Sequence, residues 1–208
     1  IIANCNQAVQ YNPDELAFFY FLGMAYYQKD DADAALDAFR RGASEINAQS
    51  DAAMASDFYA LMGDILHQKG RDEAAFAAYD SCLQWKSDNI SCLNNYAYYL
   101  SEKNLNLTKA EEMSYRTVKA EPDNATYLDT YAWILYQQKR YAEAKIYIDQ
   151  AVKNDTDTVH VTPVVIDHAG EIYMKLGDPD RAVSFWQLAI SRGGDKALFE
   201  RKIKKAKK

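Results

Sequence analysis

The feature that most constrains this fold is a pattern of large and small residues that recurs five times along the chain. In the first copy, the large residue Phe19 is followed by the pair Leu22-Gly23 and then by Tyr26, and the copy ends with Ala35 and Phe39. The small residues of the five copies are Gly23, Gly63, Ala97, Ala132 and Gly170, at successive intervals of 40, 34, 35 and 38 residues. Five copies in phase indicate an internal repeat that runs the length of the chain.

Each copy predicts two antiparallel helices, because spacings of three and four residues place the large side chains on one helical face. The small residue lets the second helix approach closely, and we expect an alanine of that helix to fit against it; these are Ala35, Ala75, Ala110, Ala144 and Ala182. Only 8 Gly and 4 Pro occur in 208 residues, which favours an all-helical chain. The longer intervals contain "EINAQSDAAMASD" and "NDTDTVHVTP", which we expect in loops or lengthened helices. Asp14, Asp88 and Asp123 are predicted helix caps or first-turn acids.

The repeat resembles the tetratricopeptide repeat (TPR) family, whose unit is about 34 residues, over essentially the whole chain. The sequence departs from that family at the first large position, where no copy has a tryptophan, and at Ser114, where an aromatic residue is usual. The resemblance implies an all-α, right-handed superhelical solenoid of antiparallel helix pairs, ending in a C-terminal capping helix. The expected units are a second helix of a truncated repeat at 1–12, five repeats at 13–49, 50–88, 89–123, 124–157 and 162–192, and a basic capping helix at 194–208.

A narrower resemblance covers the last three units. Asn95-Tyr96-Ala97-Tyr98, the stretch from Leu128 to Trp133, and His168-Ala169-Gly170-Glu171 are similar to the C-terminal repeats of bacterial cell-envelope TPR lipoproteins. This resemblance implies the bacterial cell envelope, as a periplasmic protein or an outer-membrane lipoprotein, and a cytoplasmic location stays open.

The first residues, "IIANCNQAVQYNPDE", align with the second half of a repeat. We therefore expect the chain to be the C-terminal part of a longer array. On this hypothesis, membrane association arises only through a missing N-terminal anchor.

The charge distribution disfavours nucleic-acid binding. Residues 195–208 carry a net charge of +5 against −6 for the whole chain, so residues 1–194 carry −11. A nucleic-acid binder needs a basic face for phosphate, and this body is acidic. The basic tail is read first as a solvated final helix, with contact to an acidic partner or lipid headgroups as the alternative.

No motif for catalysis, a metal or a cofactor is recognisable, so the sequence predicts no enzyme, no metal site and no cofactor. Cys5, Cys82 and Cys92 fit no metal or haem spacing and are read as small apolar residues, with a Cys82–Cys92 disulfide as a less favoured alternative. An enzyme that uses Asp167, His168 and Glu171 is the weakest hypothesis, because the repeat already accounts for these residues.

The prediction for function is a non-enzymatic scaffold that binds a peptide or protein segment in the concave groove lined by the first helices. The predicted groove residues are Tyr20, Tyr27, Asp64, Asn94, Tyr98, Asp129, Trp133, Tyr136, Gln137, Asp167 and Glu171. Their carboxylates would make the groove acidic, so a neutral or basic segment is expected. The alternatives are packing of these aromatic residues between repeats, a structural spacer, and a self-association module that forms a homo-oligomer.

Overall fold

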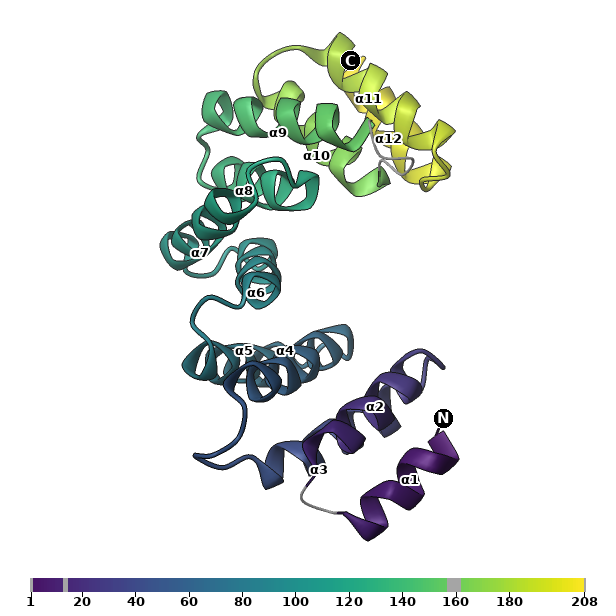
Figure 1. The fold of residues 1–208 in the computed structure, drawn as a ribbon. Helices are drawn as coiled ribbons and strands as arrows, with labels where there is room; N and C mark the ends of the chain where they lie inside the picture. Colours follow the sequence, from purple (N-terminus) through teal and green to yellow (C-terminus); the bar gives the residue numbers. More distant parts are fainter. Residues whose placement is uncertain (1, 13–14, 157–161, 208) are drawn as a thin grey trace. The chain divides into compact units, whose positions relative to one another are not determined.

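The computed structural model describes residues 2–12, 15–156 and 162–207, and this part of the chain is built of α-helices (Figure 1). The chain divides into two compact units, Ile1–Cys92 and Leu93–Lys208. The first unit contains α1 (Ile2–Tyr11), α2 (Leu16–Tyr27), α3 (Ala32–Glu45), α4 (Ala52–Gln68) and α5 (Asp72–Trp85). The division falls within α6 (Ile90–Glu102). The second unit continues with α7 (Leu107–Ala120), α8 (Ala125–Gln137), α9 (Tyr141–Thr156), α10 (Pro163–Lys175), α11 (Pro179–Ser191) and α12 (Lys196–Ala206). The all-α prediction is confirmed.

Consecutive helices pack as hairpins. In the first unit α2 packs on α3 and α4 on α5, and in the second unit α8 packs on α9 and α10 on α11. Neighbouring hairpins meet through α3 and α4 in the first unit and through α9 and α10 in the second. Each of the five ranges expected to be a repeat contains two helices.

The hairpins close around their small residues. A Cβ atom built on Gly23 of α2 would lie 2.5 Å from Cε1 of Phe39 on α3, closer than real Cβ contacts come. The atom nearest the glycine is therefore a ring atom, whereas the sequence predicted the alanine Ala35 at this contact. Ala35 is fully buried, but the ring of Phe39 fills the space that the missing side chain leaves.

The small residue of the first helix is glycine where the second helix carries a large aromatic ring four positions after its alanine, and alanine where it does not. The rings of Tyr79 and Trp186 crowd Gly63 and Gly170 in the same way. Where the small residue is alanine, the residue four positions after the second-helix alanine is smaller: Ser114 in the third repeat and Ile148 in the fourth, both fully buried. The repeats that carry glycine thus place a ring at the second position, and those that carry alanine place a smaller side chain there, as close packing at a shared contact would require.

The turn inside each hairpin has the same backbone conformation. A residue with positive φ follows each first helix: Asp30, Gly70, Asn104, Lys139 and Gly177. The amide after it donates to a carbonyl five residues earlier, as in the 2.9 Å bond from Arg71 N to Leu66 O. This is the Schellman pattern of helix ends, in which glycine or asparagine is easiest to accommodate. Lys139 adopts it at φ 64° without that freedom.

Two predicted helix caps are displaced by one residue. The side chain of Asn89 accepts the Cys92 amide hydrogen at 3.1 Å, and that of Asn124 accepts the Thr126 amide hydrogen at 3.0 Å. Each cap is thus the residue after the predicted Asp88 or Asp123, while Asp14 lies outside the described residues. An asparagine and an aspartate cap equally well, so composition alone did not separate the two positions.

The first extra stretch lengthens a helix. α4 has 17 residues against 12 in α2, so the last six of the thirteen residues of "EINAQSDAAMASD" lie in the first helix of the second repeat, and residues 46–51 form the connection before it. The second stretch lies partly in residues 157–161, outside the described residues.

The last helix covers the end of the fifth repeat. Phe199 of α12 is buried in one cluster with Ile166 of α10 and Trp186 of α11. The basic residues of the tail therefore sit on a helix whose apolar side is part of the core. In the described ranges, no helix combines the length and the apolar character that crossing a bilayer requires.

We predict that Gly23 and Phe39 are energetically coupled. Gly23→Ala should destabilise the chain by about 1–3 kcal/mol through overpacking, although alanine is the better helix former. Combining it with Phe39→Ile, which imitates the alanine–isoleucine pair of the fourth repeat, should recover part of that loss. Urea unfolding followed by circular dichroism measures the four corners of the cycle.

The matched control is the opposite exchange, Ala132→Gly with Ile148→Phe, in which the double variant should be more stable than the sum of the single changes indicates. Strict additivity of Gly23→Ala and Phe39→Ile would refute the coupling of the two positions.

Candidate functional site

The second unit contains a cavity of about 390 Å³ with both aromatic and charged walls. Its walls come from α6, α8, α10 and α12. The lining residues are Tyr98, Glu102, Trp133, Pro163, Val164, Asp167, His168, Glu171, Asp195, Leu198, Phe199 and Lys202. Mixed apolar and polar linings of this size are typical of binding sites.

His168 and Asp129 form a buried pair next to the aromatic side chains of the cavity. Nδ1 of His168 lies 2.9 Å and 3.1 Å from the two carboxylate oxygens of Asp129, and both side chains are 7% exposed. Burial by itself lowers the pKa of His168, but the charge and hydrogen bond of Asp129 outweigh it, and the pKa is raised overall. The buried carboxylate is thus hydrogen-bonded to an imidazole that matches its charge when protonated, which avoids an unpaired buried charge.

Three aromatic rings lie on or near this pair, and one of them, Trp133, is stacked on His168. The ring of Trp133 lies parallel to that of His168, with centroids 4.0 Å apart and planes at 14°. It also stacks on Tyr136 at 4.6 Å and 6°. Tyr98 on α6 lies 6.3 Å from the His168 ring. The stacking fixes the orientation of the Trp133 indole.

The indole is also held from α6. Its Nε1 donates to Oε1 of Glu102 at 2.6 Å. Stacking holds the face of the Trp133 ring and the hydrogen bond holds its edge, so Trp133 forms a rigid aromatic wall. A rigid aromatic side chain loses little conformational entropy when it binds a partner.

Lys202 of α12 neutralises the acids of α10. Its Nζ donates to Asp167 at 2.6 Å and 2.8 Å and lies 2.8 Å from Oε1 of Glu171. Burial lowers the pKa of Lys202, but these hydrogen bonds and charges raise it overall. Asp167 also accepts from Nε1 of Trp186 at 2.9 Å. Burial and the charge of Glu171 raise the pKa of Tyr136 to about 12, so that hydroxyl stays protonated.

Lys202 stands between two hollows. Lys202 and Glu171 line the 390 Å³ cavity next to Trp133. They also line a second cavity of about 360 Å³, which lies beside Met174 and Trp186. The bridge from Lys202 to α10 therefore divides the space between α10 and α12.

Six of the eight groove residues predicted in the second unit are half-buried: Tyr98, Trp133, Tyr136, Gln137, Asp167 and Glu171. The other two, Asn94 and Asp129, are each only 5% exposed, so the expectation that they face an open groove is wrong. Asp129 is buried because it pairs with His168. Among the six, Asp167 and Glu171 are partly neutralised, so this face is less acidic than predicted.

The three predicted groove residues of the first unit make separate contacts. Tyr20 packs edge-on against Phe58, with centroids 5.9 Å apart. The hydroxyl of Tyr27 accepts from Gln68 at 2.8 Å, and Asp64 accepts from the Tyr79 hydroxyl at 2.5 Å. These bonds tie first helices to their neighbours.

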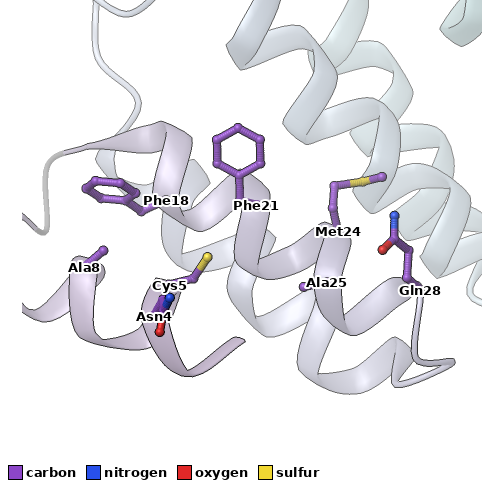
Figure 2. A pocket seen from close by; sticks show the side chains of 8 residues that line it. All are labelled: Asn4, Cys5, Ala8, Phe18, Phe21, Met24, Ala25 and Gln28. Atoms are coloured by element: carbon purple, nitrogen blue, oxygen red, sulfur yellow. The ribbon is translucent and has the colours of Figure 1, made fainter. Parts of the chain in front are cut away.

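The first unit has a different cavity, of about 490 Å³, between α1 and α2 (Figure 2). Asn4, Cys5 and Ala8 lie on α1, and Phe18, Phe21, Met24, Ala25 and Gln28 lie on α2. Phe21 is 56% exposed and also lines a neighbouring hollow beside Met54. None of the described residues that line the α1–α2 cavity is charged.

The weakest hypothesis, an enzyme based on Asp167, His168 and Glu171, gains no support from the contacts. His168 is bound to Asp129, and the two acids are bound to Lys202. Among the described residues, no group of three or more His, Cys, Asp or Glu side chains is arranged to hold a metal ion.

Three important residues were not among those predicted for the groove: Glu102, His168 and Lys202. His168 sits two positions before Gly170, one position away from those assigned to the groove. The equivalent residue Phe21 is largely exposed, so the repeat alone did not predict burial here. Lys202 lies outside the repeats, so the repeat pattern gave no expectation for where its side chain would lie.

Tandem helix hairpins, each closed by a small residue under a larger one, define an all-α helical-repeat solenoid, a class of protein that presents extended surfaces to partners. Two family models described as "Tetratricopeptide repeat" match the sequence, one at residues 3–52 and the other at 56–89 and 125–158. These matches cover more than half of the chain, which belongs to the tetratricopeptide repeat family.

Known relatives agree with this family and are distant. A TPR repeat-containing protein of Pseudomonas aeruginosa is 33% identical over 70 residues, which span 34% of this chain and only 12% of the relative. The structure of Pseudomonas aeruginosa pilF matches with a TM-score of 0.70 at 20% identity, over 88% of this chain and 79% of that one. YrrB, described as a TPR protein with an unusual peptide-binding site, matches with a TM-score of 0.70 at 16% identity, over 96% and 97% of the two chains. At these identities the structures are similar in fold.

The family supports a role as a protein–protein interaction scaffold, and TPR proteins are generally non-enzymatic.

We predict that the His168–Asp129 pair makes stability depend on pH. The folded pKa of His168 is raised, so the pair contributes stability that is fully present below the unfolded pKa, ordinarily 6.5, and is lost as pH rises through the folded pKa. The free energy of unfolding, measured in urea at about pH 6 and about pH 9, should therefore fall with pH more steeply in the wild type than in His168→Gln.

The control is His67→Gln, which removes the histidine of the His67–Asp72 pair in the first unit and leaves His168 in place. An unchanged pH dependence in His168→Gln would show that the pair does not titrate as described.

Proposed function

We propose that the protein binds a peptide or protein segment in the cavity of the second unit. The observation that carries the proposal is the rigid Trp133 wall, held by stacking on His168 and by the hydrogen bond to Glu102. A fixed aromatic surface beside an open cavity provides apolar contact area without a large entropic cost on binding. YrrB, a TPR protein of similar fold, has an unusual peptide-binding site, which supports this role.

The charges around the cavity favour a neutral or basic segment. Four carboxylates line it, from Glu102, Asp167, Glu171 and Asp195, against one lysine, Lys202. Like-charge repulsion would disfavour an acidic segment. Apolar side chains of the partner would fit against Val164 and Leu198, which are 50% and 36% exposed.

The experiment is selection of binders from a random linear peptide library, followed by titration of the selected peptides with purified variants. Trp133→Ala should weaken binding by about tenfold or more, because it removes the central apolar contact. Lys202→Gln should strengthen the binding of basic peptides, because it frees Asp167 and Glu171.

The matched control is Tyr115→Ala, which removes an aromatic side chain that is 48% exposed on α7 and does not line the cavity. Selection of acidic peptides, or equal affinity in Trp133→Ala and the wild type, would contradict the site.

Self-association is the second candidate function, supported by one observation in the first unit. Phe21 is 56% exposed and lines two apolar hollows, so it offers apolar area that a second copy could cover. In that case the mass measured by sedimentation should rise with concentration, and Phe21→Ser should abolish the rise. A mass independent of concentration removes this candidate.

We also propose a bacterial cell-envelope location, on the resemblance of the last three repeats to those of envelope lipoproteins. Cell fractionation of the native host tests it.

A further inference from the structure

Two buried thiols of the first unit lie against each other. Cys82 is in the last turn of α5 and Cys92 in the first turn of α6, and they are 0% and 1% exposed. Sγ of Cys92 lies 3.8 Å from the carbonyl oxygen of Tyr79, which is three residues before Cys82 and on the same side of α5. Each thiol shifts the pKa of the other, as neighbouring groups do. The fold thus brings together two cysteines that the turn between α5 and α6 separates in sequence.

A small polar network holds both thiols in place. Sγ of Cys82 lies 3.1 Å from Oγ of Ser56 on α4. Asn89 donates to the same Oγ at 2.9 Å and accepts the Cys92 amide hydrogen at 3.1 Å. Three helices therefore position the pair, and both cysteines are free thiols in this structure.

We propose that Cys82 and Cys92 form an intramolecular disulfide when the chain folds or opens locally in the presence of a disulfide oxidant. The Cys92 sulfur already lies beside the turn of α5 that carries Cys82, and a disulfide needs the two Cα atoms within about 7 Å of each other, which local opening of the turn between α5 and α6 would allow. The third cysteine, Cys5, is half-buried on α1, so Cys82 and Cys92 are the two cysteines expected to pair.

The reaction balances with a small-molecule disulfide such as oxidised glutathione. The Cys82 thiolate attacks one oxidant sulfur and releases the first glutathione as a thiolate, which leaves a mixed disulfide on Cys82. The Cys92 sulfur, on losing its proton, attacks Cys82 Sγ and releases the second glutathione. The two protons go to the two glutathione thiolates. The neighbouring Cys92 thiol lowers the pKa of Cys82, which favours Cys82 as the first nucleophile.

The bridge would link the end of the second repeat to the start of the third. It would restrict the unfolded chain and so raise the thermal midpoint, and burial would shield it from reductants. Disulfides persist in oxidising compartments such as the periplasm, so the redox state of this pair in cells also reports on the compartment.

The test is to unfold and refold the full chain with a mixture of reduced and oxidised glutathione, and then to measure the intact mass and the free thiols under denaturing conditions. The monomer should lose the mass of two hydrogens, keep one free thiol at Cys5, and unfold at a higher temperature. Peptide mapping should show Cys82 joined to Cys92.

Cys5→Ser is the matched control and should still lose two hydrogens, whereas Cys82→Ala and Cys92→Ala should not. Circular dichroism establishes that the variants fold, and an iodoacetamide-alkylated wild type that was never oxidised gives the reduced reference. If the refolded wild type keeps three free thiols, or carries only glutathione adducts, the disulfide proposal is wrong.

Discussion

The contact on which the rest of the structure depends is the one between a small residue on each first helix and a larger residue on the second. In the first repeat a ring atom of Phe39 occupies the place where Gly23 would carry its Cβ, so the two helix backbones approach closely. Because the contact lies inside the hairpin, each hairpin is a packing unit whose outer faces can then bind the next one. Ala132 and Ile148, both fully buried, occupy the two positions in the fourth repeat, so the repeats share a buried pair of positions there and not a particular side chain.

The repeats also place the site. Positions three before and one after the small residue carry Asp129 and Trp133 on α8, and Asp167 and Glu171 on α10. The same repeat position differs in burial between α8 and α10. Asp129 is buried against His168, whereas Asp167 is half-buried and bound to Lys202. The difference follows from the partners: Asp129 on α8 is paired with a histidine of α10, whereas Asp167 is bound to a lysine of α12.

Sequence reasoning therefore predicted the helices and the small residues at which paired helices approach, because these follow from periodicity within one repeat. It did not predict which carboxylates remain available, because that depends on partners 31 to 39 residues away. The Glu102–Trp133 bond, the His168–Asp129 pair and the Lys202–Asp167 bridge each join residues that no local pattern connects. The alanine expected beside Gly23 illustrates the same limit, since spacing identified the facing helix but not the atom that fills the gap.

Lys202 connects the acidic body of the chain with its basic tail. A helix with so many lysines would ordinarily stay solvated, but the apolar side of α12 packs in the core through Phe199 and so carries Lys202 to the acids of α10. Partly exposed ion pairs contribute little to stability. Their effect here is on charge: one ammonium offsets two carboxylates at the cavity wall and separates two hollows. If the cavity binds a segment as proposed, a partner with its own cation would compete for those carboxylates, whereas a neutral partner would leave the bridge intact. On that proposal α12 would influence which segments the site accepts, in addition to packing against the fifth repeat.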